Sequence, residues 1–149
     1  MNEIIWLLLV FVVLNVLDGY TTWLGLYHLP ADLRGREANP TFKSVENSFW
    51  PAMIKKGIFA VFGLWLLYRL ASVESLYVVD LVFVVVVLNN AGIYLSRRIS
   101  KKRLRGPVEF SILFFRRCHL PERASRLLGF YVLFSLVFVG CYFFVRTVL

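Results

Sequence analysis

The residues of this chain that could do chemistry begin with an aspartate inside a long apolar segment. Asn15, Asp18, Thr22 and Gly25 recur at the spacing of one helical face, within an apolar run at residues 4–29. A carboxylate near the middle of a membrane-spanning helix costs at least about 2.5 kcal/mol on insertion scales, so it is expected to face a partner or a wet cavity. Asp18 is therefore the predicted centre of a polar intramembrane site.

The composition predicts the elements that must position this site. The chain has 149 residues, of which 59% are hydrophobic and 17% aromatic. Several apolar runs of about 20 residues indicate transmembrane helices. We therefore predict an all-α, polytopic membrane protein that forms a single membrane domain over residues 1–149, with four spans at about 4–29, 51–71, 76–96 and 127–149.

The basic residues predict the orientation of these spans. All of the 17 lysines and arginines except Arg69 and Arg146 fall within segments 30–56 and 97–126, which lie on one side of the predicted membrane. Cytoplasmic segments of membrane proteins carry an excess of basic residues. We therefore expect a multi-pass protein of the cell membrane, with both termini outside and a basic cytoplasmic connector at 97–126.

Within the basic connector, the segment at 108–117 mixes aromatic and basic residues and is too short to cross a membrane. It is typical of an interfacial helix or a re-entrant stretch, because basic clusters beside a membrane attract anionic lipid headgroups. A topology signal with lipid contact is preferred to docking of a cytoplasmic partner, and nucleic-acid binding is not expected. The predicted headgroup contacts are Arg97, Arg98, Lys101, Lys102, Arg103, Arg105, Arg116 and Arg117.

The second span offers two lysines that could pair with Asp18. Lys56 shares a helical face with Ala60 and Gly63, small residues that let another helix approach closely. Lys55 lies on a side that looks lipid-facing, where a lysine can extend its ammonium group towards the headgroups. The periodicity therefore favours Lys56 as the partner.

The depth of Asp18 sets a condition on this pairing. If the first helix continues to Leu29, Asp18 lies about 16 Å from its inner end, too deep for a lysine about one turn into the second span. We therefore expect either that the first helix breaks near Gly25 or that the loop at 37–40 dips into the bundle. A purely structural Asp18–Lys56 pair remains an alternative to a working site.

The third span carries a second polar stripe. Asn89, Gly92 and Ser96 share one face, and Asn89 is the next candidate partner of Asp18, while Asn90 points about 100° away. Asp80 lies close to the outer end of the span and is expected to be interfacial. The predicted substrate- or ion-binding set is Asn15, Asp18, Thr22, Glu37, Asn39, Lys56 and Asn89.

The same residues resemble an uncharacterised prokaryotic family of small multi-span membrane proteins. Its pattern is N-x-x-D-x-x-x-T in the first span, E-x-N-P in the following loop and a lysine in the second span. The matching residues are Asn15, Asp18, Thr21 or Thr22, Glu37, Asn39, Pro40, and Lys55 or Lys56. This resemblance implies a polar intramembrane constellation without an activity. A likeness to small multidrug transporters, which also have four spans and a carboxylate midway along the first, is one of architecture alone.

These observations predict three functions in order of preference. The first is ion- or proton-coupled transport, or a channel-like function, with Asp18 as the binding site and two or more copies forming the path. The second is an assembly or scaffold subunit that docks another membrane protein through its polar face. The third is a lipid-modifying enzyme with Asp18 and Glu37 as acid and base. No metal ion or cofactor is expected, because Cys118 and Cys141 are too few for a zinc site.

Overall fold

The computed structural model describes residues 3–34, 49–103 and 105–148, and every regular element in these ranges is helical. Four helical segments are long and apolar enough to cross a membrane, and they agree with the four predicted spans. The third and fourth helices extend further than predicted. The elements are α1 Glu3–Trp23, the π-helical η1 Leu24–His28, α2 Phe49–Leu70, α3 Val73–Ser100, α4 Pro107–Arg117 and α5 Glu122–Val148.

The limits of α3 and α4 follow from local chemistry. Ser72 caps the start of α3, where its hydroxyl accepts a hydrogen bond from the Ser75 backbone N–H at 3.2 Å. The helix ends at Ser100, and the next residue, Lys101, adopts a left-handed conformation with φ 53°. In α4, Pro107 occupies the first turn, and the Glu109 carboxylate accepts a hydrogen bond from the Gly106 N–H at 3.1 Å. The predicted interfacial connector thus contains a short helix.

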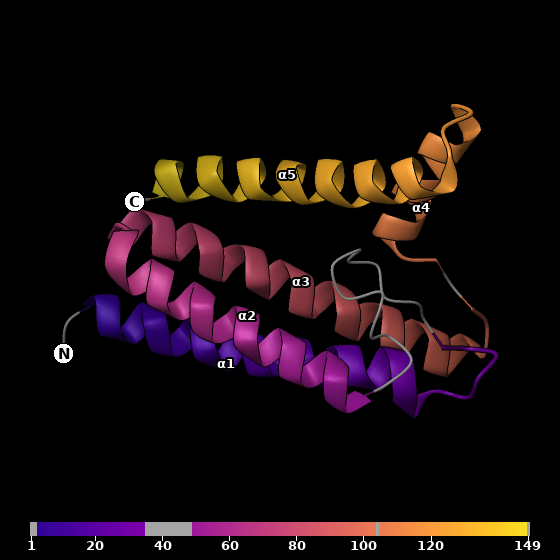
Figure 1. Cartoon of the computed structure of the whole chain (residues 1–149), viewed down its shortest axis with the longest axis horizontal. Coiled ribbons are helices and arrows are strands. Elements are labelled where there is room, and N and C mark those ends of the chain that lie inside the picture. Colours follow the sequence, from indigo (N-terminus) through magenta and orange to yellow (C-terminus); the bar gives the residue numbers. More distant parts are fainter. Residues whose placement is uncertain (1–2, 35–48, 104, 149) are drawn as a thin grey trace.

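The four long helices lie side by side, with the N- and C-terminal ends of the chain at the same end of the molecule (Figure 1). α1 contacts both α2 and α3, and α3 also contacts α5. Towards the N-terminal end of α3, Val78 and Val82 pack against Cys141 and Val145 of α5. At the opposite end α4 packs against α5 so closely that a Cβ on Gly129 would lie 2.8 Å from the α4 backbone.

The interface between α1 and α3 carries a series of paired side chains. Both helices run in the same direction, so a later residue of α1 pairs with a later residue of α3. The pairs are Glu3 with Tyr77, Phe11 with Phe83, Asp18 with Asn90, and His28 with Tyr94. We call this interface the α1–α3 seam, and it positions the polar groups described next.

Candidate intramembrane polar site

Asp18 lies at the centre of a cluster that joins three helices. Its Oδ2 atom is 3.1 Å from the Lys56 ammonium of α2, and its Oδ1 atom accepts a hydrogen bond from the Asn90 amide of α3 at 3.1 Å. The same ammonium donates to the Thr22 hydroxyl at 2.8 Å. Thr22 lies four residues after Asp18, on the same face of α1. The predicted pairing of Asp18 with Lys56 rather than Lys55 is therefore present in the structure.

The start of α2 explains how Lys56 reaches this depth. α2 begins at Phe49, before the predicted start near Pro51, so Lys56 is about 10 Å into the helix. The antiparallel register of α1 and α2 is visible at two glycines. A Cβ on Gly63 would touch the Phe11 ring at 3.5 Å, and one on Gly19 would touch the Met53 sulfur at 3.7 Å. Lys56 lies between these two contacts and is therefore opposite Asp18.

The first helix does not break near Gly25, as one of the two conditions required, but changes its helix type there and continues to His28. The α-helical segment ends at Trp23, and the chain continues as a π-helix from Leu24 to His28 before Leu29 becomes extended. π-helical turns are rare and occur frequently at functional sites. The second condition, an inward loop at 37–40, and the predicted site residues Glu37 and Asn39 lie outside the described residues.

The two asparagines of α3 have the opposite roles to those expected. Asn90 reaches Asp18, whereas Asn89 lies on another side of the helix. There it lines a hollow with Gly92, Ile93, Ser96 and Arg105. The rotation of α3 about its axis decides this outcome, because adjacent residues on a helix point about 100° apart. Asn89, the candidate named in case Lys56 could not reach Asp18, thus does not bind it, and Asn90 binds it beside Lys56.

Asn15 shares the predicted face but does not bind Asp18 in the structure. Its amide donates to the carbonyl of Phe11, one turn earlier in the same helix, at 2.8 Å. Thr21 behaves in the same way and donates to the carbonyl of Leu17 at 2.9 Å. Both side chains therefore form hydrogen bonds with the backbone of their own helix, which is common for polar residues in apolar surroundings.

The end of the α1–α3 seam that lies beside the basic connector carries a network of His28, Tyr94 and Arg98 that was not predicted. The His28 ring nitrogen Nδ1 lies 3.1 Å from the Tyr94 hydroxyl, and the Arg98 guanidinium donates to the same hydroxyl at 3.1 Å. Tyr94 is buried, so its hydroxyl meets protein rather than solvent. The spacing of Asn90, Tyr94 and Arg98 at intervals of four residues was the signal that could have revealed it.

Asp80, which was expected to be interfacial, is buried within the protein. It is 6% exposed, and neither carboxylate oxygen has a hydrogen-bond partner. A buried polar group without a partner is unusual in a native structure and needs an explanation.

The basic connector divides into buried and exposed parts. Arg97, predicted to contact headgroups, is only 4% exposed, and its guanidinium lies 3.3 Å from the Glu109 carboxylate of α4. It therefore ties α3 to α4 instead of facing lipid. The other predicted headgroup contacts are exposed or partly exposed, namely Arg98, Lys101, Lys102, Arg103, Arg105, Arg116 and Arg117.

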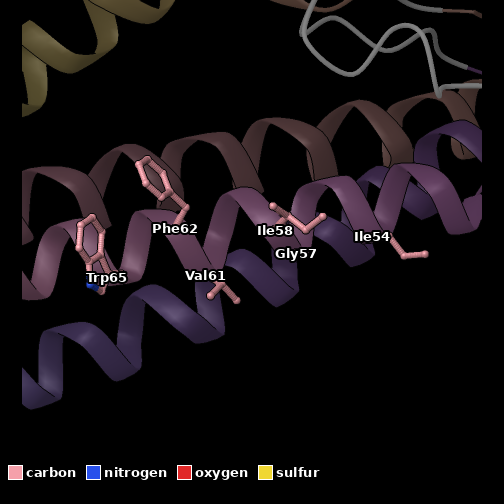
Figure 2. Close-up of a pocket in the computed structure, with 6 residues that line it drawn as sticks. All are labelled: Ile54, Gly57, Ile58, Val61, Phe62 and Trp65. Carbon is pink, nitrogen blue, oxygen red and sulfur yellow. The ribbon is translucent and has the colours of Figure 1, made fainter.

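A second hollow lies on an exposed face of α2 and is lined mainly by apolar side chains. Figure 2 shows its lining of Ile54, Gly57, Ile58, Val61, Phe62 and Trp65 along one side of the helix. Neither this hollow nor the one beside Asn89 is lined by Asp18 or Lys56. Within the described ranges, no group of three or more His, Cys, Asp and Glu residues could hold a metal ion.

Comparisons with models of known families, with curated proteins and with solved structures found no match for this chain. The function must therefore be argued from the polar groups themselves.

Proposed function

We propose that this protein moves protons or another cation across its membrane, with the Asp18–Lys56 pair as the exchangeable centre. The observation that carries the proposal is the distribution of ionisable groups along the α1–α3 seam. Glu3 and Tyr77 lie at the outer end, followed by Asp80, by the Asp18 cluster, and by His28 with Tyr94 at the inner end. Ionisable residues inside membrane spans are costly and mark ion pathways and proton relays.

The geometry of the Asp18 cluster suits an exchange reaction. A proton that arrives on Oδ2 of Asp18 neutralises the carboxylate and removes its attraction for the Lys56 ammonium, which keeps its hydrogen bond to Thr22. A metal cation instead competes with the ammonium for the same oxygen, with the Asn90 and Thr22 side chains beside it. In both cases Lys56 acts as an internal cation that replaces the transported one.

The partial exposure of the pair supports assembly into an oligomer. The side chains of Lys56 and Asp18 are 18% and 16% exposed in the single chain. Charged groups that face lipid at this depth are expensive, so a second copy that covers the open edge of the cluster lowers this cost. The path would then run between copies, which agrees with the small volume that four helices enclose.

Flux measurements in proteoliposomes test the proposal. Purified protein is reconstituted, and proton flux is followed with an internal pH-sensitive dye under an imposed gradient, with and without Na⁺ or K⁺. We expect flux in the unaltered protein and its loss in Asp18→Asn and Lys56→Met. Ser135→Ala, on an exposed part of α5, is the matched control and should retain flux. Unchanged flux in Asp18→Asn would show that the assignment is wrong.

A second candidate function rests on the completeness of the same cluster. Both oxygens of Asp18 have partners, and the Lys56 ammonium donates to Asp18 and to Thr22. A cluster whose opposite charges neutralise each other can have a structural role and hold α1, α2 and α3 together in an assembly subunit. In that case the reconstituted protein shows no flux, and Asp18→Asn lowers stability alone. Crosslinking in native membranes would then capture the same partner at a fixed ratio, and this partner would be lost from the Asp18→Asn protein.

A further inference from the structure

Asp80 is the polar residue of the described chain that the Asp18 cluster leaves unexplained. Both of its oxygens are buried without a hydrogen-bond partner, and the residue as a whole is 6% exposed. An isolated ionised carboxylate in an apolar environment is so unfavourable that such groups are neutralised instead. The question is which positive species neutralises Asp80.

The position of Asp80 follows from its neighbours along α3. Val78 and Val82, each two residues away, face α5, so Asp80 points to nearly the opposite side of the helix. Along the seam it lies between Tyr77, which bonds to Glu3, and Phe83, which contacts Phe11. Asp80 is thus a member of the α1–α3 seam, about 15 Å along the helix from Asn90.

The charged side chains nearest this level are engaged elsewhere or exposed. Glu3 of α1 accepts a hydrogen bond from Tyr77 at 2.9 Å. Arg69, at the end of α2, is exposed, and Arg146 of α5 donates to Tyr142 at 3.1 Å. The Lys56 ammonium is bound to Asp18 and Thr22. None of these groups makes an ion pair with Asp80 in the described structure.

A metal cation does not fit this position, whereas a proton does. Hard cations such as Ca²⁺ and Mg²⁺ take about six oxygen ligands. Among the neighbours of Asp80 along α3, Leu76 and Phe83 supply no side-chain oxygen, and the Tyr77 hydroxyl is bonded to Glu3. A proton needs one oxygen, and it also creates an O–H donor that can reach the backbone carbonyl one turn earlier. Asn15 and Thr21 use this solution in α1.

We propose that Asp80 is a proton-binding site of the seam, held as the neutral acid at neutral pH and able to exchange its proton. This site specifies the proposed function, because it names the proton as the ion that moves. Its role in coupling rests on that proposed function. Asp80 then receives a proton from the outer side, and Asp18 exchanges it against Lys56 further in. The neutral state of Asp80 itself does not depend on transport.

Infrared spectroscopy of the full-length protein in lipid tests the site directly. A neutral carboxylic acid has a carbonyl stretch that is separate from the bands of carboxylates and amides. We expect such a band at pH 7 that is lost in Asp80→Asn and retained in Asp18→Asn. In D₂O the band should shift, because the acid proton exchanges. If Asp80→Asn does not fold, Asp80→Glu serves instead and should move the band rather than remove it.

The outcomes separate this inference from the proposed function. Absence at pH 7 of any neutral-acid band that depends on residue 80 overturns the inference. If the band is present but does not shift in D₂O, the proton of Asp80 does not exchange, and that part of the inference is wrong. The band together with a lack of proton flux in proteoliposomes refutes the proposed function and leaves Asp80 as a neutral buried acid. Flux that is unchanged in Asp80→Asn excludes Asp80 from the proton path.

Discussion

Removal of the Lys56 ammonium is the most direct test of the polar cluster. In Lys56→Met the stem of the side chain keeps its length, but Asp18 retains only the Asn90 amide as a partner. Breaking a buried ion pair in this way costs about 3–5 kcal/mol, against about 0–1 kcal/mol for an exposed pair. The side chains are 18% and 16% exposed, which is closer to the buried case. We therefore expect a loss of about 3 kcal/mol in the free energy of unfolding.

A double-mutant cycle separates the pair from its surroundings. Asp18→Asn should also be destabilising, because it removes the carboxylate that the Lys56 ammonium binds and leaves that charge beside the Thr22 hydroxyl. The double variant Asp18→Asn/Lys56→Met contains neither charge, so it should be more stable than the sum of the single losses implies. We expect a coupling energy of about 2 kcal/mol, within the range of residues in direct contact. The hydrogen bond to Thr22 should contribute less, about 0.6 kcal/mol in Thr22→Val.

The assay is reversible unfolding in mixed micelles with increasing denaturing detergent, followed by circular dichroism. Arg69→Met is the matched control, since Arg69 is an exposed cation on the same helix, and it should change stability by less than about 0.5 kcal/mol. Additive single losses in the cycle, or a cost of Lys56→Met no larger than that of Arg69→Met, would refute the interpretation of this contact as a strong ion pair.

Three further variants test other parts of the structure. Asn90→Leu should destabilise the protein by about 0.6–1.7 kcal/mol in the same unfolding assay, because it removes a partner of Asp18, whereas Asn89→Leu should cost less. Gly129→Ala should lower stability by about 1–3 kcal/mol because its Cβ meets the α4 backbone, and Gly140→Ala, with open space around it, should be neutral or stabilising. A membrane-impermeant maleimide should label the exposed Cys118 only after the cells are permeabilised, and labelling of intact cells would reverse the predicted orientation.

Local periodicity was sufficient to predict much of this protein. Long apolar runs identified the four helices that are long and apolar enough to cross a membrane, because such a helix must satisfy its backbone internally and cover itself with apolar side chains. The choice of Lys56 over Lys55 was also local, since it depended only on which face of one helix carries small residues. Both predictions are properties of single helices, and both agree with the structure.

The position of Lys56 along its helix was harder to predict. The predicted start of α2 rested on Pro51, yet the helix begins at Phe49. Proline is accepted anywhere in the first turn, so it marks the start of a helix only to within a few residues. The register of α2 against α1, visible at Gly19 with Met53 and at Gly63 with Phe11, is what places the ammonium beside Asp18.

The partners of α3 were decided by tertiary structure alone. Residues 81–88 are apolar on every side, so the sequence contains no polar face that would orient this helix about its axis. Its rotation is set by packing, with Phe83 against Phe11 on one side and Val82 against α5 on the other. That rotation brought Asn90 rather than Asn89 to Asp18, and it buried Asp80 in the seam. The sequence by itself thus determined which residues share a helix face, whereas the packing of whole helices determined which faces meet.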